Sequence, residues 1–217
     1  LSECFQNLHL TLQRRRSQTL KEKKMSLTKV SYSMISGAVV NVLDFGADPT
    51  GITDSSQSFL DAINSLTNGG TVFVPAGTYY ICIAPSKPNI VLCGEATKST
   101  ILINSTTISG RYTIDYDLGA QSSAKLPMSV VIKNLTITGN RTSNYHGLRL
   151  AGLKAGGTNN IEFNDVSYGL FLSNCFATLH TNHFYRNFDV GLQGDISAAS
   201  NNNSFDTLHF FGGNANN

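Results

Sequence analysis

A glycine–leucine pair recurs at a fixed spacing in the second half of the chain. Gly147-Leu148 is followed by Gly169-Leu170 and then by Gly191-Leu192, with the same interval between successive pairs, and Gly213 continues the series at that interval. Self-similarity at a fixed period is the signature of a repeat protein, in which each repeat packs mainly on its neighbours. The repeat therefore predicts a solenoid.

Phenylalanines form a second ladder in the same region. Phe163, Phe184 and Phe205 follow one another at a constant interval that is one position shorter than that of the glycines. Two ladders of nearly the same period predict a coil of about 21–22 residues, and matching residues of neighbouring parallel strands lie about 4.8 Å apart. We therefore expect the three leucines and the three phenylalanines to form two inward stacks, in which each buried side chain contributes about 1.5–3 kcal/mol.

The strand pattern distinguishes between the solenoid classes with this period. A leucine-rich repeat needs the pattern L-x-x-L-x-L with a fixed Asn, which is absent here. A β-sandwich with chance Gly-Leu pairs is the other alternative, and two ladders in phase argue against it. Short apolar runs bounded by Asn, Gly or Pro favour a parallel β-helix with several strands per coil; they cover residues 71–74, 79–83, 89–93, 101–103, 112–114, 129–132 and 135–137.

One amphipathic helix is expected ahead of these strands, over about residues 54–67. Asp54 is a suitable N-cap with Gln57 three residues later, and Gly69-Gly70 follows the helix with residues that tolerate left-handed dihedrals. Its apolar face consists of residues at helical spacing, namely Phe59, Ala62, Ile63 and Leu66. We expect this helix to cap the exposed end of the core, and we assign Asp44, Asp48 and Asp54 structural roles.

The charges divide the chain into unequal parts. Residues 1–29 carry a net charge of +5, whereas the rest carries −3, for a total of +2. A mildly acidic folded part argues against nucleic-acid binding. Residues 1–24 are read as a basic leader, disordered or not native, residues 25–39 as a linker, and residues 40–217 as the β-helix domain with coils over about 71–217. We expect no membrane span and find no signal peptide, because no long apolar run follows the basic cluster.

The segment that precedes the coils resembles a known family. Residues 40–54 read VNVLDFGADPTGITD and residues 69–79 read GGTVFVPAGTY, with the predicted helix between them. This order resembles the entry segment of pectate-lyase-superfamily β-helix proteins, which include rhamnogalacturonases, polygalacturonases and bacteriophage tailspike depolymerases. The resemblance implies an all-β, right-handed, single-stranded parallel β-helix with an N-terminal capping α-helix. It also implies a polysaccharide partner, a homotrimer and a virion or extracellular location.

The residues themselves identify no clear catalytic centre. Glycoside hydrolysis needs two carboxyl groups that flank the bond, and the acids beyond the cap are Asp115, Asp117, Glu162, Asp165, Asp189, Asp195 and Asp206. The interval of the phenylalanine ladder places Glu162 beside His183, both pointing outward, as a candidate acid/base couple. The same spacing pairs Asp165 with Arg186 as an ion pair between coils. Glu162, His183 and Asp165 are therefore the candidate catalytic residues.

No cofactor can be identified from the sequence. The four cysteines show no CxxC spacing, which gives no indication of a zinc site. Calcium would be required if the full-length protein is a calcium-dependent lyase. The chain ends in mid-repeat, so we expect it to be an N-terminal fragment that lacks later coils. Three hypotheses remain: a glycan depolymerase, as hydrolase or lyase; a non-catalytic glycan-binding adhesin; and a structural stalk of a virion or cell-surface protein.

Overall fold

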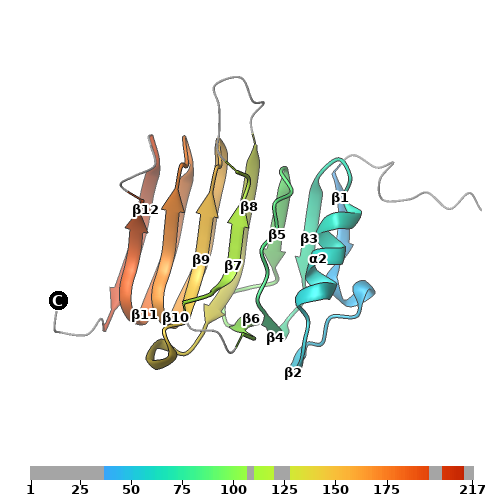
Figure 1. Ribbon diagram of the computed structural model, residues 1–217, viewed down its shortest axis with the longest axis horizontal. Helices are drawn as coiled ribbons and strands as arrows, with labels where there is room; N and C mark the ends of the chain where they lie inside the picture. Colours follow the sequence, from blue (N-terminus) through green and yellow to red (C-terminus); the bar gives the residue numbers. More distant parts are fainter. Residues whose placement is uncertain (1–36, 107–109, 120–127, 196–201, 213–217) are drawn as a thin grey trace, which may run out of the picture. The chain divides into compact units, whose positions relative to one another are not determined.

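The computed structural model describes residues 37–106, 110–119, 128–195 and 202–212. Parallel strands follow one another in curved, stacked coils, with the one α-helix of these residues beside the first coils (Figure 1). The predicted leader, residues 1–24, and most of the linker lie outside the described residues. No described helix has the length and hydropathy needed to cross a membrane.

Short strands form the first coils, and most of the later strands are longer. In chain order they are β1 (Ala38–Asn41), the 3₁₀ turn η2 (Val42–Phe45), β2 (Thr50–Asp54), α2 (Ser56–Ser65), β3 (Gly70–Val74), β4 (Gly77–Ile81), β5 (Ile90–Gly94), β6 (Thr100–Asn104), β7 (Tyr112–Asp117), β8 (Ser129–Thr138), η3 (Arg141–Ser143), β9 (His146–Ala151), β10 (Ala155–Ser173), β11 (Leu179–Gly194) and β12 (Ser204–Phe211). Each predicted apolar run from residue 71 to residue 137 overlaps a strand, although the run 79–83 extends past the end of β4 and the run 89–93 begins one residue before β5.

Three rows of parallel pairing form the faces of the coil. The longest row runs β1-β3-β5-β8-β10-β11-β12. A second row joins β2, β4, β6 and the end of β8, and a third joins β7, β9 and the end of β10. Every one of these pairs is parallel, because each coil brings the chain back in the same direction beside the last. The chain is a parallel β-helix, as predicted.

Single residues with left-handed backbone turn the chain at the corners. Asn134, Asn160 and Asn182 lie on successive coils and have φ of 59°, 54° and 56°. Asparagine tolerates this conformation better than most residues with a β-carbon. The amide of Asn160 donates to Asn134 Oδ1 at 3.2 Å, and that of Asn182 donates to Asn160 Oδ1 at 3.0 Å. The long strands β8, β10 and β11 can therefore bend without interrupting the pairing.

The leucine ladder is confirmed. Leu148 pairs with Leu170, and Leu170 pairs with Leu192, in the register that the interval of the Gly-Leu pairs requires. Leu148 and Leu170 are fully buried and Leu192 is partly buried. Gly213, the next member of the predicted series, lies outside the described residues.

The phenylalanine ladder was predicted wrongly. Phe163 pairs with Tyr185, whose partner on the next coil is Phe210. These three rings stack, with centroid distances of 5.1 Å and 4.6 Å. Phe184 instead pairs with Glu162 and His209, and Phe205 stacks on His180. The true register differs from the phenylalanine interval on both coils, and a shift of one position moves a side chain to the other face of a strand.

Helix α2 begins at Ser56, two residues later than predicted. Its N-cap is Ser55, and the Asp54 carboxylate accepts a hydrogen bond from the Ser56 backbone N–H at 2.7 Å. Gln57 does not close the expected capping box, because its amide donates to Asp61 instead. The buried face of the helix includes Phe59, which contacts Tyr79 of β4 edge to face.

Asp48 organises the loop between η2 and α2. Its two carboxylate oxygens accept hydrogen bonds from the backbone N–H groups of Thr50, Ile52 and Thr53 and from both threonine hydroxyls. The bonds from Thr50 and then Thr53 lower the pKa of Asp48 well below its usual range, although the group is exposed. These contacts support a structural role for this aspartate in the GADPTGITD segment.

Candidate functional site

Two aspartates of β7 point to the outside of the coil. Ile114 and Tyr116 are fully buried, whereas the alternating residues Asp115 and Asp117 are partly exposed. Side chains two residues apart on a strand lie on the same face. The sequence segment YTIDYD thus places two carboxylates next to each other on the outer surface.

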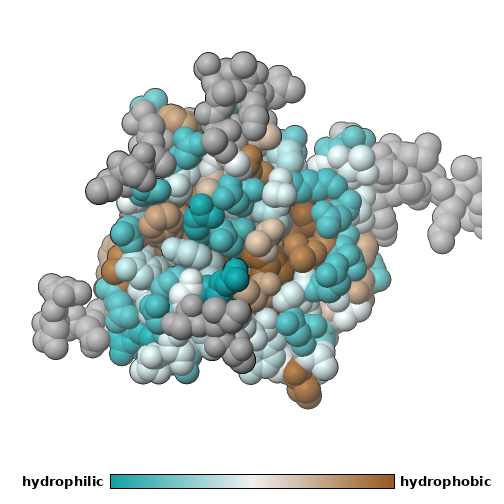
Figure 2. All heavy atoms as spheres, viewed as in Figure 1, coloured by the Kyte–Doolittle hydropathy of each residue, from teal (hydrophilic) through white to brown (hydrophobic). Residues whose placement is uncertain are grey.

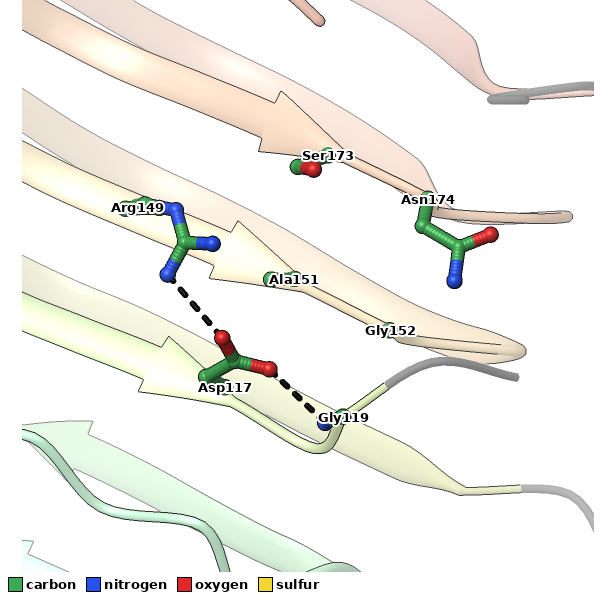
Figure 3. A pocket seen from close by; sticks show the side chains of 7 residues that line it. All are labelled: Asp117, Gly119, Arg149, Ala151, Gly152, Ser173 and Asn174. Atoms are coloured by element: carbon green, nitrogen blue, oxygen red, sulfur yellow. Dashed lines mark hydrogen bonds and ion pairs between the residues drawn. The ribbon is translucent and has the colours of Figure 1, made fainter. Parts of the chain in front are cut away.

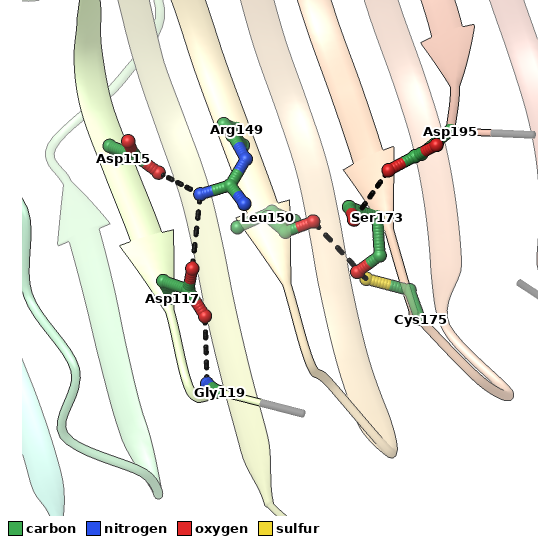
Figure 4. A network of polar contacts seen from close by, with 8 residues as sticks. All are labelled: Asp115, Asp117, Gly119, Arg149, Leu150, Ser173, Cys175 and Asp195. Atoms are coloured by element: carbon green, nitrogen blue, oxygen red, sulfur yellow. Dashed lines mark hydrogen bonds and ion pairs between the residues drawn. The ribbon is translucent and has the colours of Figure 1, made fainter. Parts of the chain in front are cut away.

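Arg149 of β9 lies between the two carboxylates. It pairs in register with Asp115, and its Nη1 donates to Asp115 Oδ1 at 2.6 Å and to Asp117 Oδ2 at 3.2 Å (Figure 4). The other oxygen of Asp117 accepts a bond from the Gly119 backbone N–H at 2.7 Å. Although partial burial opposes it, bonding to both carboxylates raises the pKa of Arg149. The three side chains carry a net charge of about −1 at neutral pH.

Two hollows flank Arg149. The first has a volume of about 420 Å³ and lies at the carboxyl ends of β7, β9 and β10 (Figure 3). The second has a volume of about 360 Å³ and extends from Arg149 toward the preceding coil. The first is lined by Asp117, Gly119, Arg149, Ala151, Gly152, Ser173 and Asn174, and the second by Cys82, Ile83, Ala84, Gly110, Arg111, Tyr112, Asp115 and Arg149. We call the two hollows together the Arg149 groove.

Aromatic rings lie beside the groove. The ring of His146 is 4.9 Å from that of Tyr112 and 4.7 Å from that of Tyr168, measured between centroids. Phe171 pairs in register with Arg149, and its ring centroid lies 6.2 Å from that of Tyr112. Hydrophilic and hydrophobic residues are interspersed on the face of the molecule that Figure 2 shows. The groove thus combines carboxylates, a guanidinium and aromatic surface.

The carboxylate spacing suits chemistry on a glycosidic bond. Because both oxygens bond the same nitrogen, at 2.6 and 3.2 Å, their separation cannot exceed the sum of these lengths. The limit applies to one oxygen of each carboxylate, and it is compatible with the roughly 5–5.5 Å between the carboxyl groups of retaining glycosidases. The arrangement can therefore flank a bond between two sugars, provided that Arg149 moves or takes part in binding.

The predicted Glu162–His183 couple does not form. His183 pairs in register with Ile161 and is fully buried inside the coil, whereas Glu162 lies beside Phe184 on the other face. The assumed spacing was one position short of the true register, and one position changes the face. Burial lowers the pKa of His183 to about 4, so that its ring is neutral at pH 7.

The predicted ion pair of Asp165 with Arg186 is also wrong. Arg186 donates to Glu162 Oε1 at 3.1 Å and pairs in register with Asn164. Asp165 occupies a corner with left-handed backbone at φ 53°. A catalytic role for Glu162, His183 or Asp165 stays a prediction, but the geometry that motivated it is absent.

Arg149 is the residue that sequence reasoning missed. The alternation Asp115-x-Asp117 within an apolar strand was a readable signal for two outward carboxylates. Arg149 follows Asp115 by 34 residues, so the coil that joins them is longer than the repeat. Its position after Gly147-Leu148 nevertheless marks an outward site, which Phe171 and Gln193 occupy on the next coils.

Metal binding receives no support from side-chain clustering. Within the described ranges, no group of three or more His, Cys, Asp or Glu side chains could hold a metal ion. Calcium dependence therefore stays a prediction that concerns the full-length protein.

Comparisons with known proteins place the fold in a family. Residues 39–214 match the model of the family described as rhamnogalacturonase A/epimerase, pectate lyase-like. The tail spike protein of Shigella phage Sf6 is 28% identical over 115 residues, which is 48% of this chain and 17% of that protein. This chain thus spans less than a fifth of the length of that relative.

Two solved structures share the architecture. The A-module of the Azotobacter vinelandii mannuronan C-5 epimerase AlgE4 has a TM-score of 0.52 and 19% identity, over 79% of this chain and 58% of that one. The catalytic unit of an α-1,3-glucanase from Streptomyces thermodiastaticus has a TM-score of 0.58 and 22% identity, over 82% and 39%. At sequence identities this low, the similarity to the two structures establishes a shared fold only. Because the family model spans most of the chain, the chain belongs to the rhamnogalacturonase A/epimerase, pectate lyase-like family.

Proposed function

We propose that this chain is part of a polysaccharide-acting protein, and that a glycan binds across its outer face in the Arg149 groove. The observation that carries the proposal is the pair of outward carboxylates, Asp115 and Asp117, held around one guanidinium. The comparisons support it, because the matched structures include an epimerase and a glucanase by name. The proposal concerns the whole protein, since this chain spans only part of the length of its relatives.

Two kinds of cleavage fit such a site. In a hydrolase, one carboxyl group would protonate the leaving oxygen while the other attacks the sugar or activates water. In a lyase, a base would remove a proton next to a carboxylate of the sugar, and calcium would stabilise the resulting charge. The side chains in the groove supply carboxylates for the first mechanism, and we place hydrolysis ahead of elimination.

The tail spike relative suggests where the protein works. Its name describes a phage tail protein, and we extend this to a virion location and a homotrimer for the full-length protein. Light scattering after size-exclusion chromatography measures the number of chains. A monomeric full-length protein would contradict the trimer without affecting the proposed groove.

The test of cleavage uses the full-length protein and variants of the groove. We expect Asp115→Asn and Asp117→Asn each to lower the rate of reducing-end release from the polysaccharide by about 10²-fold or more, because acid/base groups contribute about 10²–10⁴. Asp189→Asn is the matched control, since Asp189 is an exposed aspartate that faces Arg141 outside the groove.

Absorbance at 235 nm separates the two reactions, because elimination leaves an unsaturated product. Loss of that absorbance with EDTA would assign a calcium-dependent lyase. If both aspartate variants cleave as fast as the wild type, the groove is the wrong site. If no polysaccharide is cleaved by the wild-type protein, the enzymatic proposal fails.

One observation favours a binding module as the second candidate. Arg149 bonds one oxygen of each carboxylate, and the Gly119 backbone N–H bonds the other oxygen of Asp117. These bonds hold the carboxylates in fixed positions, as a site that only binds a glycan requires. An adhesin would bind the glycan with a measurable Kd and would release no reducing ends from it during a long incubation. Retained binding together with absent cleavage would select this function.

A further inference from the structure

A column of outward residues runs along the longest row of strands. Val39 of β1 pairs in register with Thr71 of β3, and each later member pairs with the one before it through β5, β8 and β10 to β11 (Figure 1). Because neighbouring strands lie about 4.8 Å apart, the five steps of the column extend over about 24 Å. We call this column the apolar strip; its members are Val39, Thr71, Val91, Val131, Gly157 and Leu179.

The apolar strip faces solvent. At its two ends, Val39 is 62% exposed and Leu179 is 53% exposed. Thr71, Val91 and Val131 between them are partly exposed, whereas the residue that follows each of these three in the sequence is fully buried. Single exposed apolar residues are ordinary, but a contiguous exposed apolar patch marks an interaction site.

The strands beneath the strip read like strands that are buried on both faces. β3 has the sequence GTVFV, β5 has IVLCG and β8 begins with SVVIK. A strand with one face in water alternates apolar and polar residues, whereas a strand covered on both faces is a near-continuous apolar run. The outward residues of these three strands are therefore suited to contact with another apolar surface.

The next outward column borders the strip. On β3 and β5 it consists of Phe73 and Cys93, which widen the apolar surface. On the following strands it consists of Lys133, Asn159 and Thr181, which are polar. An apolar centre with a polar rim is the usual composition of an interface between proteins.

The chemistry of the strip favours a protein partner over a glycan. Sugars are bound by aromatic rings and by a few polar side chains that fix their orientation. Of the six members of the strip, only Thr71 carries a side-chain hydrogen-bonding group, and none carries a ring or a charge. A surface without cations is equally unsuited to the phosphates of a nucleic acid.

We infer that the apolar strips of three copies of the chain converge on the symmetry axis of the homotrimer. The inference rests on the trimer of the proposed function and specifies the face that builds it. In a closed ring of identical subunits, a side chain at the axis meets its own copies. A charge at that place would be repeated in each subunit and would repel its copies, and the strip has none.

The position of the strip is compatible with glycan binding elsewhere. It follows the direction in which the coils stack, so three copies that share it lie side by side with their coils in the same order. The Arg149 groove lies on the row of β7 and β9, which is a different row of strands. Assembly and glycan binding thus use separate surfaces.

Cross-linking of the full-length protein tests this geometry. Leu179→Cys places a thiol on the strip, and a short bifunctional maleimide joins thiols of neighbouring chains. We expect covalent dimers on a denaturing gel, because only a residue near a symmetry axis lies next to its own copy. Gln193→Cys is the matched control, since Gln193 is also an exposed residue of β11 but pairs with Phe171 on the row of the groove. For this control we expect single chains, and the unsubstituted protein measures the background from native cysteines.

A charge placed on the strip tests its contribution to assembly. We expect Val91→Glu to raise the dissociation constant of the trimer at least about tenfold, because unpaired carboxylates would be buried together at the axis. Gln193→Glu adds the same charge on the row of the groove and should leave the dissociation constant unchanged. Light scattering over a dilution series measures both, and circular dichroism verifies that each variant is folded.

The inference and the proposed function can fail separately. If the trimer forms but Leu179→Cys gives no covalent dimer and Val91→Glu associates like the wild type, the strip is not the interface, although the trimer stands. If peptide mapping finds the introduced thiol joined only to a cysteine of its own chain, another segment of the same chain covers the strip and the inference is wrong. A monomeric full-length protein contradicts both the trimer and the strip, and cleavage still decides the function of the groove.

Discussion

Single residues at the corners determine where the coil turns. Asn134, Asn160 and Asn182 occupy one corner of successive coils with left-handed backbone. The residue that follows Asn182 in this series is Thr207, because Thr181 pairs with Asp206 and His183 pairs with Leu208. Thr207 has φ of 55°, which a β-branched side chain tolerates poorly. The fourth coil thus has the same left-handed backbone at this corner, but with a threonine where the three preceding coils have an asparagine.

Replacing this threonine should stabilise the last described coil. We expect Thr207→Asn to raise the free energy of unfolding by about 1 kcal/mol, because asparagine relieves part of the cost of left-handed backbone. Its amide would also donate to Asn182 Oδ1, as Asn182 donates to Asn160. Chemical denaturation measures the change. Thr207→Ala is the control, because alanine has neither the amide nor a tolerance of positive φ, and an equal gain from it would rule out the ladder.

At the scale of the elements, glycines and rings are matched across the coil. A β-carbon at Gly169 would lie 2.5 Å from the Gly191 carbonyl oxygen and 2.7 Å from the Tyr185 ring. Gly147 and Gly191 have the same relation to Phe163 and Phe210. Only glycine therefore fits at these recurring positions, because the stack of aromatic rings fills the interior beside them.

This packing predicts the effect of one methyl group. We expect Gly169→Ala to lower the free energy of unfolding by about 1–3 kcal/mol, the usual cost of overpacking a core. Gly194→Ala adds the same methyl group where no atom lies within 4 Å, and it should be nearly neutral. Urea denaturation of both variants makes the comparison. Equal stability of the two variants would show that the interior yields without cost.

The same elements show how far sequence reasoning reached. The Gly-Leu pairs were in true register, because β9, β10 and β11 are joined by coils of equal length. The phenylalanines were not, because their spacing fell one position short of the register and the coil leading to β12 is longer. Period alone does not reveal such a shift, and the Glu162–His183 prediction failed for the same reason.

The sequence pattern predicts the two aspartates of the groove but not their contact with Arg149. The alternation of Asp115 and Asp117 with buried residues could be read from the strand pattern. Their contact with Arg149 spans 34 residues, and no repeat in the sequence has that length. Residues brought together by coils of irregular length can be identified only once the register is known.

At the scale of the whole molecule, a chain of polar groups crosses the interior of the solenoid. Thr158 Oγ1 contacts both His180 Nδ1, at 2.7 Å, and His183 Nε2, at 2.8 Å. His180 also contacts the Thr178 hydroxyl, and His183 contacts the Tyr185 hydroxyl. Both imidazoles are completely buried. Burial lowers the pKa of His180 to about 3 and that of His183 to about 4, and the neighbouring His183 lowers that of His180 further.

These neutral histidines make the fold sensitive to acid. An unfolded histidine binds its proton below about pH 6.5, whereas the folded protein resists protonation until about pH 4 or lower. The unfolded state therefore binds more protons in this window, and stability falls as the pH falls. Asp48 acts at a lower pH, because its lowered pKa contributes stability that is lost only below the usual value of 3.8. The window from pH 7 to pH 5 thus reports mainly on the buried histidines.

The expected loss between pH 7 and pH 5 is about 2 kcal/mol for each buried histidine. Urea denaturation at the two pH values measures it, and because coils of a solenoid stabilise one another, the effect should extend to the whole transition. His183→Gln should be less stable at pH 7 but should lose about 2 kcal/mol less on acidification than the wild type does. His209→Gln, which changes an outward histidine stacked on Phe184, is the control for replacing a histidine outside the interior. If His183→Gln and the wild type lose the same stability, the folded protein binds a proton at His183 as readily as the unfolded chain does. The lowered pKa of His183 would then be wrong.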